Sequence, residues 1–132
     1  MGLDIDIYKE NKRVKRNHIT FIGGNGWPLV TYFENLHNKE FSNDEVKASQ
    51  DDIRDIIEKC RDIMISYFQK TFEWDKNEWI DYAQATLPIS NREDRVWYDK
   101  TYVDDLFIIY EELMSIYKEM DIDEFIVFEI SY

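Results

Sequence analysis

The last nine residues of the chain, 124–132 (EFIVFEISY), most constrain how it can fold. One face of this segment is wholly apolar and the other mostly so, since Ile126, Phe128 and Ile130 alternate with Phe125, Val127 and Glu129. A strand that is apolar on both faces is usually covered on both sides and therefore lies inside a sheet, away from its edges. The segment thus requires neighbouring strands from elsewhere in the chain.

The N-terminal residues can supply these neighbours. Residues 3–9 alternate apolar Leu3, Ile5 and Ile7 with polar positions, which is the period of a half-buried strand. Residues 18–23 (HITFIG) repeat the pattern and end at a glycine, and a basic connector, KENKRVKRN, lies between the two segments. We expect a hairpin with this connector at its exposed tip.

Helical periodicity dominates the middle of the chain. Helices are predicted at 28–37, 50–71 and 76–85, and a last helix follows Asp99. Pro28 suits a first helical turn, Ser49 with Asp52 resembles a capping box, and Asp75 can cap the third helix. The segment 41–48 reads as polar and turn-rich, and 89–99 as a loop with a short strand at 95–98 as an alternative.

Together these segments predict an α+β fold. Its small antiparallel sheet combines the N-terminal hairpin with the C-terminal strand, and three to four helices pack on one face. The length of 132 residues favours a single domain spanning 1–132, and an apolar fraction of 44% is ample for one core. The only cysteine, Cys60, falls among the apolar positions of the second helix, where core packing is its expected role.

The net charge of −12 indicates which kinds of molecule the protein can bind. Residues 1–31 carry five bases and three acids, 32–98 nine bases and fifteen acids, and 99–132 two bases and ten acids, so the segment charges are +2, −6 and −8. A field of this sign argues against direct binding of nucleic acid. With neither a membrane-spanning apolar run nor a signal sequence in evidence, we expect a protein of the bacterial cytoplasm without a membrane partner.

Two stretches of acids are candidate contacts for a basic protein. The row Asp51, Asp55, Glu58 and Asp62 is interleaved with Arg54 and Lys59, which favours pairs within its own helix. The acids of the last helix and the following turn have far fewer bases nearby. The predicted partner-binding residues are therefore Asp104, Asp105, Glu111, Glu112, Glu119, Asp121, Asp123 and Glu124.

The glycine-rich stretch FIGGNGWPLV at 21–30 raises a second possibility. It lacks the lysine of a phosphate-binding loop and the glycine spacing of a dinucleotide site, but amides before a helix can hold an anion. The candidate ligand-binding residues are Gly23, Gly24, Asn25 and Gly26, with Asp4, Asp6, Tyr98 and Asp99 nearby. His18 and His37 lack metal-ligand spacing, so no metal, cofactor or catalytic residue is predicted.

Several short motifs resemble those of small phage and mobile-element proteins that begin Met-Gly-Leu-Asp-Met-Tyr-Leu. The matching positions are Gly2, Leu3, Asp4, Tyr32, Phe33, Leu87, Pro88, Tyr98, Asp99, Tyr102, Asp105 and Leu106. The chain departs from that pattern at Val30, where the family has histidine, and at residues 23–27 and 91–97. The resemblance implies a mobile-element origin but no particular chemistry.

Three hypotheses follow. In the first, the protein is a non-enzymatic interaction module that binds a basic host protein and inhibits a nucleic-acid-handling or defence system, as an anti-CRISPR protein would. In the second, it binds a small ligand, or acts as an enzyme, at the Gly23–Gly26 turn. In the third, it is a structural homo-oligomer whose aromatic side chains form the subunit interfaces.

Overall fold

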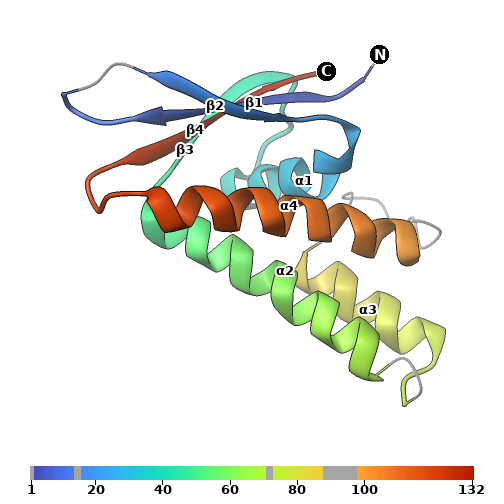
Figure 1. Ribbon diagram of the computed structural model, residues 1–132. Helices are drawn as coiled ribbons and strands as arrows, with labels where there is room; N and C mark the ends of the chain where they lie inside the picture. Colours follow the sequence, from blue (N-terminus) through green and yellow to red (C-terminus); the bar gives the residue numbers. More distant parts are fainter. Residues whose placement is uncertain (1, 14–15, 71–72, 88–97) are drawn as a thin grey trace.

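The fold is described from a computed structural model for residues 2–13, 16–70, 73–87 and 98–132. A four-stranded sheet lies above a set of helices (Figure 1). The elements in chain order are β1 (Asp4–Glu10), β2 (Asn17–Ile22), the short 3-10 helix η1 (Gly24–Gly26), α1 (Trp27–His37), β3 (Asn43–Ala48), α2 (Gln50–Lys70), α3 (Lys76–Thr86), α4 (Lys100–Glu119) and β4 (Phe125–Ser131).

The sheet confirms the central position predicted for the C-terminal strand. Its order is β2-β1-β4-β3, and every neighbouring pair is antiparallel. Ile126, Phe128 and Ile130 are buried on the face that the helices cover. Val127 is also fully buried, although it lies on the opposite face between its cross-strand neighbours Tyr8 and Lys47. β4 is therefore buried along its helix-covered face and at Val127 on the outer face, where Phe125 and Glu129 are exposed.

β3 is a difference from the sequence prediction, which treated 41–48 as irregular. Only Val46 and Ala48 of this strand are buried, and its other side chains are polar. The strand forms at the edge of the sheet because β4 offers it a free row of backbone hydrogen-bonding groups. The alternative strand at 95–98 lies almost wholly outside the described residues.

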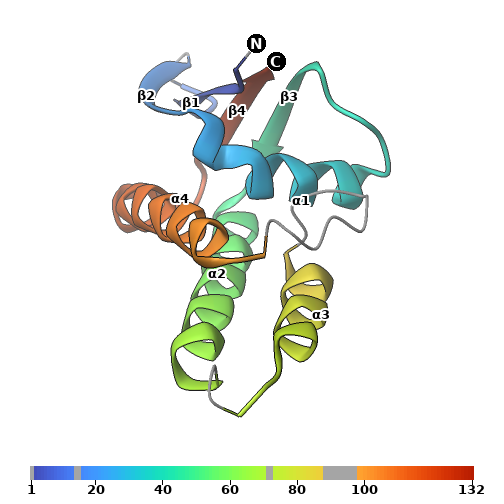
Figure 2. The same ribbon diagram turned by 90° about the vertical axis from the view of Figure 1, so that its right-hand side faces the viewer.

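The helices cover one face of the sheet, as predicted. Figures 1 and 2 show α1, α2 and α4 beneath it, while α3 lies beside α2 and farther from the strands. Side chains from the strands and from α1, α2 and α4 meet in one core, whose fully buried members include Ile5, Ile7, Phe33, Ile53, Ile56, Ile63, Leu106, Ile109 and Leu113. Cys60 lies in this core, and burial raises the pKa of its thiol to about 12.

The predicted helix starts are confirmed by their capping hydrogen bonds. Before α2, the Asp52 amide donates to the Ser49 hydroxyl at 3.2 Å and the Ser49 amide donates to the Asp52 carboxylate at 2.9 Å. Asp75 accepts a bond of 2.8 Å from the Glu78 amide, and Asp99 accepts one of 2.9 Å from the Thr101 amide. These bonds satisfy backbone donors that no helical carbonyl can reach.

Close packing against the strands explains why the glycine-rich turn has a glycine at position 26. A Cβ atom at this position would lie 2.5 Å from Ile5 Cδ1 and 3.0 Å from Ile22 Cγ2. Both isoleucines are buried core residues, so only glycine lets η1 approach the strands this closely. At Gly24, in contrast, an added Cβ would meet no atom within 4 Å.

Replacing Gly26 with alanine should therefore destabilise the fold. We expect Gly26→Ala to lower the free energy of unfolding by about 1–3 kcal/mol, because the new methyl group overpacks the core. Urea denaturation followed by circular dichroism would measure the change, with Gly24→Ala as the matched control. Equal stabilities of the two variants would contradict a packing role for Gly26.

Candidate partner-binding surface

The outward side of α4 combines acidic and apolar side chains. The helix turns Tyr102, Leu106, Ile109 and Leu113 into the core, which places Asp104 and Glu111 on the opposite, exposed side. Phe107 and Ile108 lie between these two acids in sequence and are 49% and 36% exposed. An apolar pair beside carboxylates is a surface that can bind a protein with both apolar and basic groups.

The same surface is hollowed farther along α4. An open pocket of about 330 Å³ is lined by residues of this one helix: Tyr110, Glu111, Met114, Ser115, Lys118 and Glu119. Two of the predicted acids, Glu111 and Glu119, are therefore at its wall. Tyr110 and Met114 are only partly buried and contribute apolar surface to it.

Asp105 lies at the border of this surface and is half-buried. Burial raises the pKa of its carboxyl to about 6, and the neighbouring charges of Asp104 and Asp99 act in the same direction. Three carboxylates within seven residues thus repel one another at neutral pH. A cation bound nearby would relieve this repulsion.

Glu124 differs from the other predicted contact residues because it is buried. Its carboxylate lies 3.2 Å from the Lys9 ammonium group and accepts a hydrogen bond of 2.7 Å from the Asp121 amide. The Glu124 amide donates in return to the Asp121 carbonyl at 3.1 Å. Glu124 therefore fixes the turn between α4 and β4 from within.

The turn that Glu124 holds presents an exposed apolar side chain. Ile122 is 89% exposed, and the exposed residues Asp121 and Asp123 flank it. Lys9 also donates to the Glu119 carbonyl at 3.2 Å, which ties β1 to the end of α4. Because its backbone is held on several sides, the turn can present Ile122 to a partner with little loss of conformational entropy.

The eight predicted acids do not form one cluster. Asp104 and Glu119 are fifteen residues apart on one helix, which corresponds to about 22 Å along its axis. Asp104 and Asp105 lie at one end, Glu111 and Glu112 in the middle, and Glu119 with the turn residues at the other end. The structure thus arranges them as a long strip, and Glu112, like Asp105, is only partly exposed.

The outer face of the sheet holds a charged network that sequence reasoning missed. Glu10 pairs with Arg16 at 3.1 Å and with Lys47 at 2.9 Å, and Arg16 also pairs with Glu45. These bonds lower the pKa of the Glu10 carboxyl, with the Lys47 hydrogen bond as the main cause. The network connects β1 and the hairpin connector to β3, which no local sequence pattern could indicate.

Ion pairs involve some of the acids on the sheet but few of those on α4 and its turn. Of the eight predicted contact residues, only Glu124 forms an ion pair with another described residue. On the sheet, by comparison, Glu10 and Glu45 both pair with Arg16, and Asp6 forms a hydrogen bond of 3.0 Å with His18. The negative charge of α4 and its turn is left for solvent or a partner.

The Gly23–Gly26 turn does not line either of the two pockets described for this structure. The Gly26 amide donates to the Gly23 carbonyl at 2.9 Å, and Gly26 is buried, while Gly24 and Asn25 are exposed. The turn stays an untested candidate.

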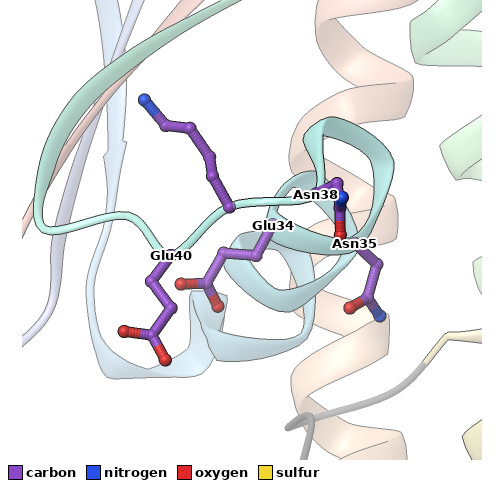
Figure 3. Close-up of a pocket in the computed structure, with 5 residues that line it drawn as sticks. Glu34, Asn35, Asn38 and Glu40 are labelled. Carbon is purple, nitrogen blue, oxygen red and sulfur yellow. The ribbon is translucent and has the colours of Figure 1, made fainter.

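The second open pocket, of about 320 Å³, lies at the C-terminal end of α1 (Figure 3). Its lining residues are Glu34, Asn35, Asn38, Lys39 and Glu40. The Glu34 carboxylate accepts hydrogen bonds from the Phe41 amide at 2.8 Å and the Tyr132 hydroxyl at 3.3 Å. Asn38 ends the helix in the left-handed conformation, with a φ of 53°. Glu34 and Asn38 thus already have roles in ending α1.

Within the part of the chain that the structure describes, no three His, Cys, Asp or Glu side chains are grouped so that they could hold a metal ion. The raised pKa of Cys60 keeps its buried thiol protonated at neutral pH, which makes it a poor nucleophile. None of the described helices combines the length and apolar character needed to span a membrane.

Comparison of the chain with known protein families, curated proteins and solved structures gave no significant match. The structure does show what several residues of the phage-protein resemblance do locally. Leu87, Tyr98, Tyr102 and Leu106 are all buried, and the Tyr102 hydroxyl donates to the Leu87 carbonyl. These motif residues pack the start of α4 against the end of α3.

The raised pKa of Asp105 predicts a specific pH dependence of stability. The folded pKa of Asp105, about 6, exceeds the unfolded value of about 4. The free energy of unfolding therefore falls as the pH rises from about 4 to about 6 and the buried carboxyl ionises. We expect Asp105→Asn to stabilise the protein by about 1 kcal/mol at pH 7, after allowance for screening by solvent, and to have little effect near pH 4.

Urea denaturation at both pH values would measure this difference, with the exposed Glu111→Gln as the control on the same helix. A stabilisation by Asp105→Asn that is equal at the two pH values would argue against burial of an ionised carboxylate as the cause.

Proposed function

We propose that the protein is a non-enzymatic, acidic interaction module of phage or mobile-element origin that inhibits a basic nucleic-acid-handling or defence protein of the host. It binds this partner through the outward side of α4 and the turn that follows. The resemblance to small mobile-element proteins supports the origin, and the surface of α4 supports the mode of binding.

The observation that carries the proposal is the uncompensated charge of α4 and its turn, in a segment, 99–132, that holds ten acids and only two bases. Seven of the eight predicted contact residues form no ion pair with any other described residue. Unpaired like charges repel one another and lower the stability of the fold slightly. Binding of a partner of opposite charge removes this repulsion, which favours the complex. A partner with a basic groove meets this requirement.

The surface also has exposed apolar residues, which can contribute binding affinity in addition to the charges. Phe107 and Ile108 lie beside Asp104 and Glu111, and Ile122 projects from the turn. In protein interfaces a few buried apolar or aromatic side chains supply most of the affinity, and surrounding charges steer association and select the partner. A strip of carboxylates about 22 Å long could then compete with nucleic acid for a basic groove.

Neutralising the strip should weaken partner binding strongly. The test variant replaces Asp104, Glu111, Asp121 and Asp123 with the corresponding amides, all four residues being exposed. The matched control neutralises the same number of exposed acids on α2: Asp51, Asp55, Glu58 and Asp62. We expect the α4 variant to lose about tenfold or more in affinity, while the α2 variant binds nearly as the wild type.

The measurement starts by capturing partners of the immobilised protein from a bacterial lysate at low and high salt and identifying them by mass spectrometry. The affinity of each purified partner for the three proteins is then determined by calorimetry. Binding that is insensitive to salt, or equal loss in both variants, would count against the proposal.

A further inference from the structure

The two edges of the sheet differ in how they are protected. β3, at one edge, carries Asp44, Glu45 and Lys47, and charged side chains of this kind discourage another strand from pairing. β2, at the other edge, contains no Asp, Glu, Lys or Arg between Asn17 and Ile22. Ile19 and Phe21 of β2 are 41% and 51% exposed. β2 is therefore an edge strand without Asp, Glu, Lys or Arg, with two exposed apolar side chains and a row of backbone hydrogen-bonding groups that no other strand pairs.

The pairing of β1 with β2 limits how long an added strand could be. Ile7 pairs with Thr20 and Tyr8 with His18, so Ile19 is an extra residue that has no partner on β1. Such a bulge bends the strand locally. An added segment would follow β2 regularly for only a few residues on either side of Ile19.

β2 lies on the same side of the molecule as α4. In Figure 1 both face the viewer, with α4 below the strand, and in Figure 2 both lie at the left. A strand added to β2 would therefore lie over the outer side of α4. Its alternate side chains would point toward the helix layer, where Asp104 and Glu111 are exposed on α4.

From this arrangement we infer that β2 is the docking edge for an extended segment of the basic partner, an inference that rests on the proposed function. The segment adds as a fifth strand. Its basic side chains point toward the acids of α4, and its apolar side chains lie beside Phe21 on the outer face. A second copy of this chain fits the edge poorly, because it would bring another α4, with the acids of residues 99–132, close to the first.

A short peptide can test strand addition directly. The probe is a peptide of about eight residues in which L-lysine alternates with L-valine, which suits a strand with one basic and one apolar face. The control has the same composition and charge but contains D-valine, which prevents a regular strand. Both are titrated into the isotopically labelled protein, and NMR follows amide hydrogen exchange in β2 and β3.

We expect the L-peptide to bind about tenfold or more tightly than the control and to slow exchange of amides within Asn17–Ile22. Ile19→Lys should abolish this preference by placing a charge on the edge, while Ile65→Lys, at a residue of α2 that is exposed to nearly the same degree, should preserve it. Asp104→Asn combined with Glu111→Gln should weaken binding of the L-peptide.

Equal affinity for the two peptides would overturn strand addition and leave the acidic surface of the proposed function intact. Binding of neither peptide, or protection of β3 instead of β2, would also overturn it. Failure of the proposed function itself would show separately, as the absence of salt-sensitive capture of a basic protein by the wild type.

Discussion

Burial of β4, complete on the helix-covered face and reaching Val127 on the other, is the constraint on which much of the structure depends. A strand with apolar side chains on both sides must have a strand at each edge and cover above and below. β1 and β3 supply the edges, and the helices cover Ile126, Phe128 and Ile130. On the open face, Val127 is shielded between Tyr8 and Lys47, and Lys47 pairs with Glu10, which also pairs with Arg16. The places of β1, β3 and the helices that cover the sheet follow from this requirement.

Several bases from the first half of the chain form ion pairs on or beside the sheet. Arg16 pairs with Glu10 and Glu45, and Lys47 pairs with Glu10. The charges of these two bases are therefore compensated on the sheet. Lys9 points the other way and pairs with Glu124 beneath the turn after α4. Few bases remain in the C-terminal segment to compensate the acids of α4.

Local patterns predicted the helices and their caps well, because a cap or an amphipathic stripe depends on residues three or four positions apart. Ser49 with Asp52, Asp75 and Asp99 are examples. β3 escaped prediction because only Val46 and Ala48 point inward, too few to give a clear alternation. Glu124 looked like an exposed acid, since its partner Lys9 is 115 residues away in the sequence. Gly26 looked like part of a ligand loop because its contacts with Ile5 and Ile22 arise only after folding.

The sequence by itself determined the α+β class, the central place of the last strand and the acidic character of α4, since each depends on composition or on short-range periodicity. The tertiary structure alone decided which charges are paired and which edge of the sheet is open. Ion pairs such as Arg16 with Glu45 and Lys9 with Glu124 join distant segments, and the exposure of Ile19 and Phe21 depends on which strand lies at the edge. Both properties depend on distances through space, which spacing along the chain does not specify.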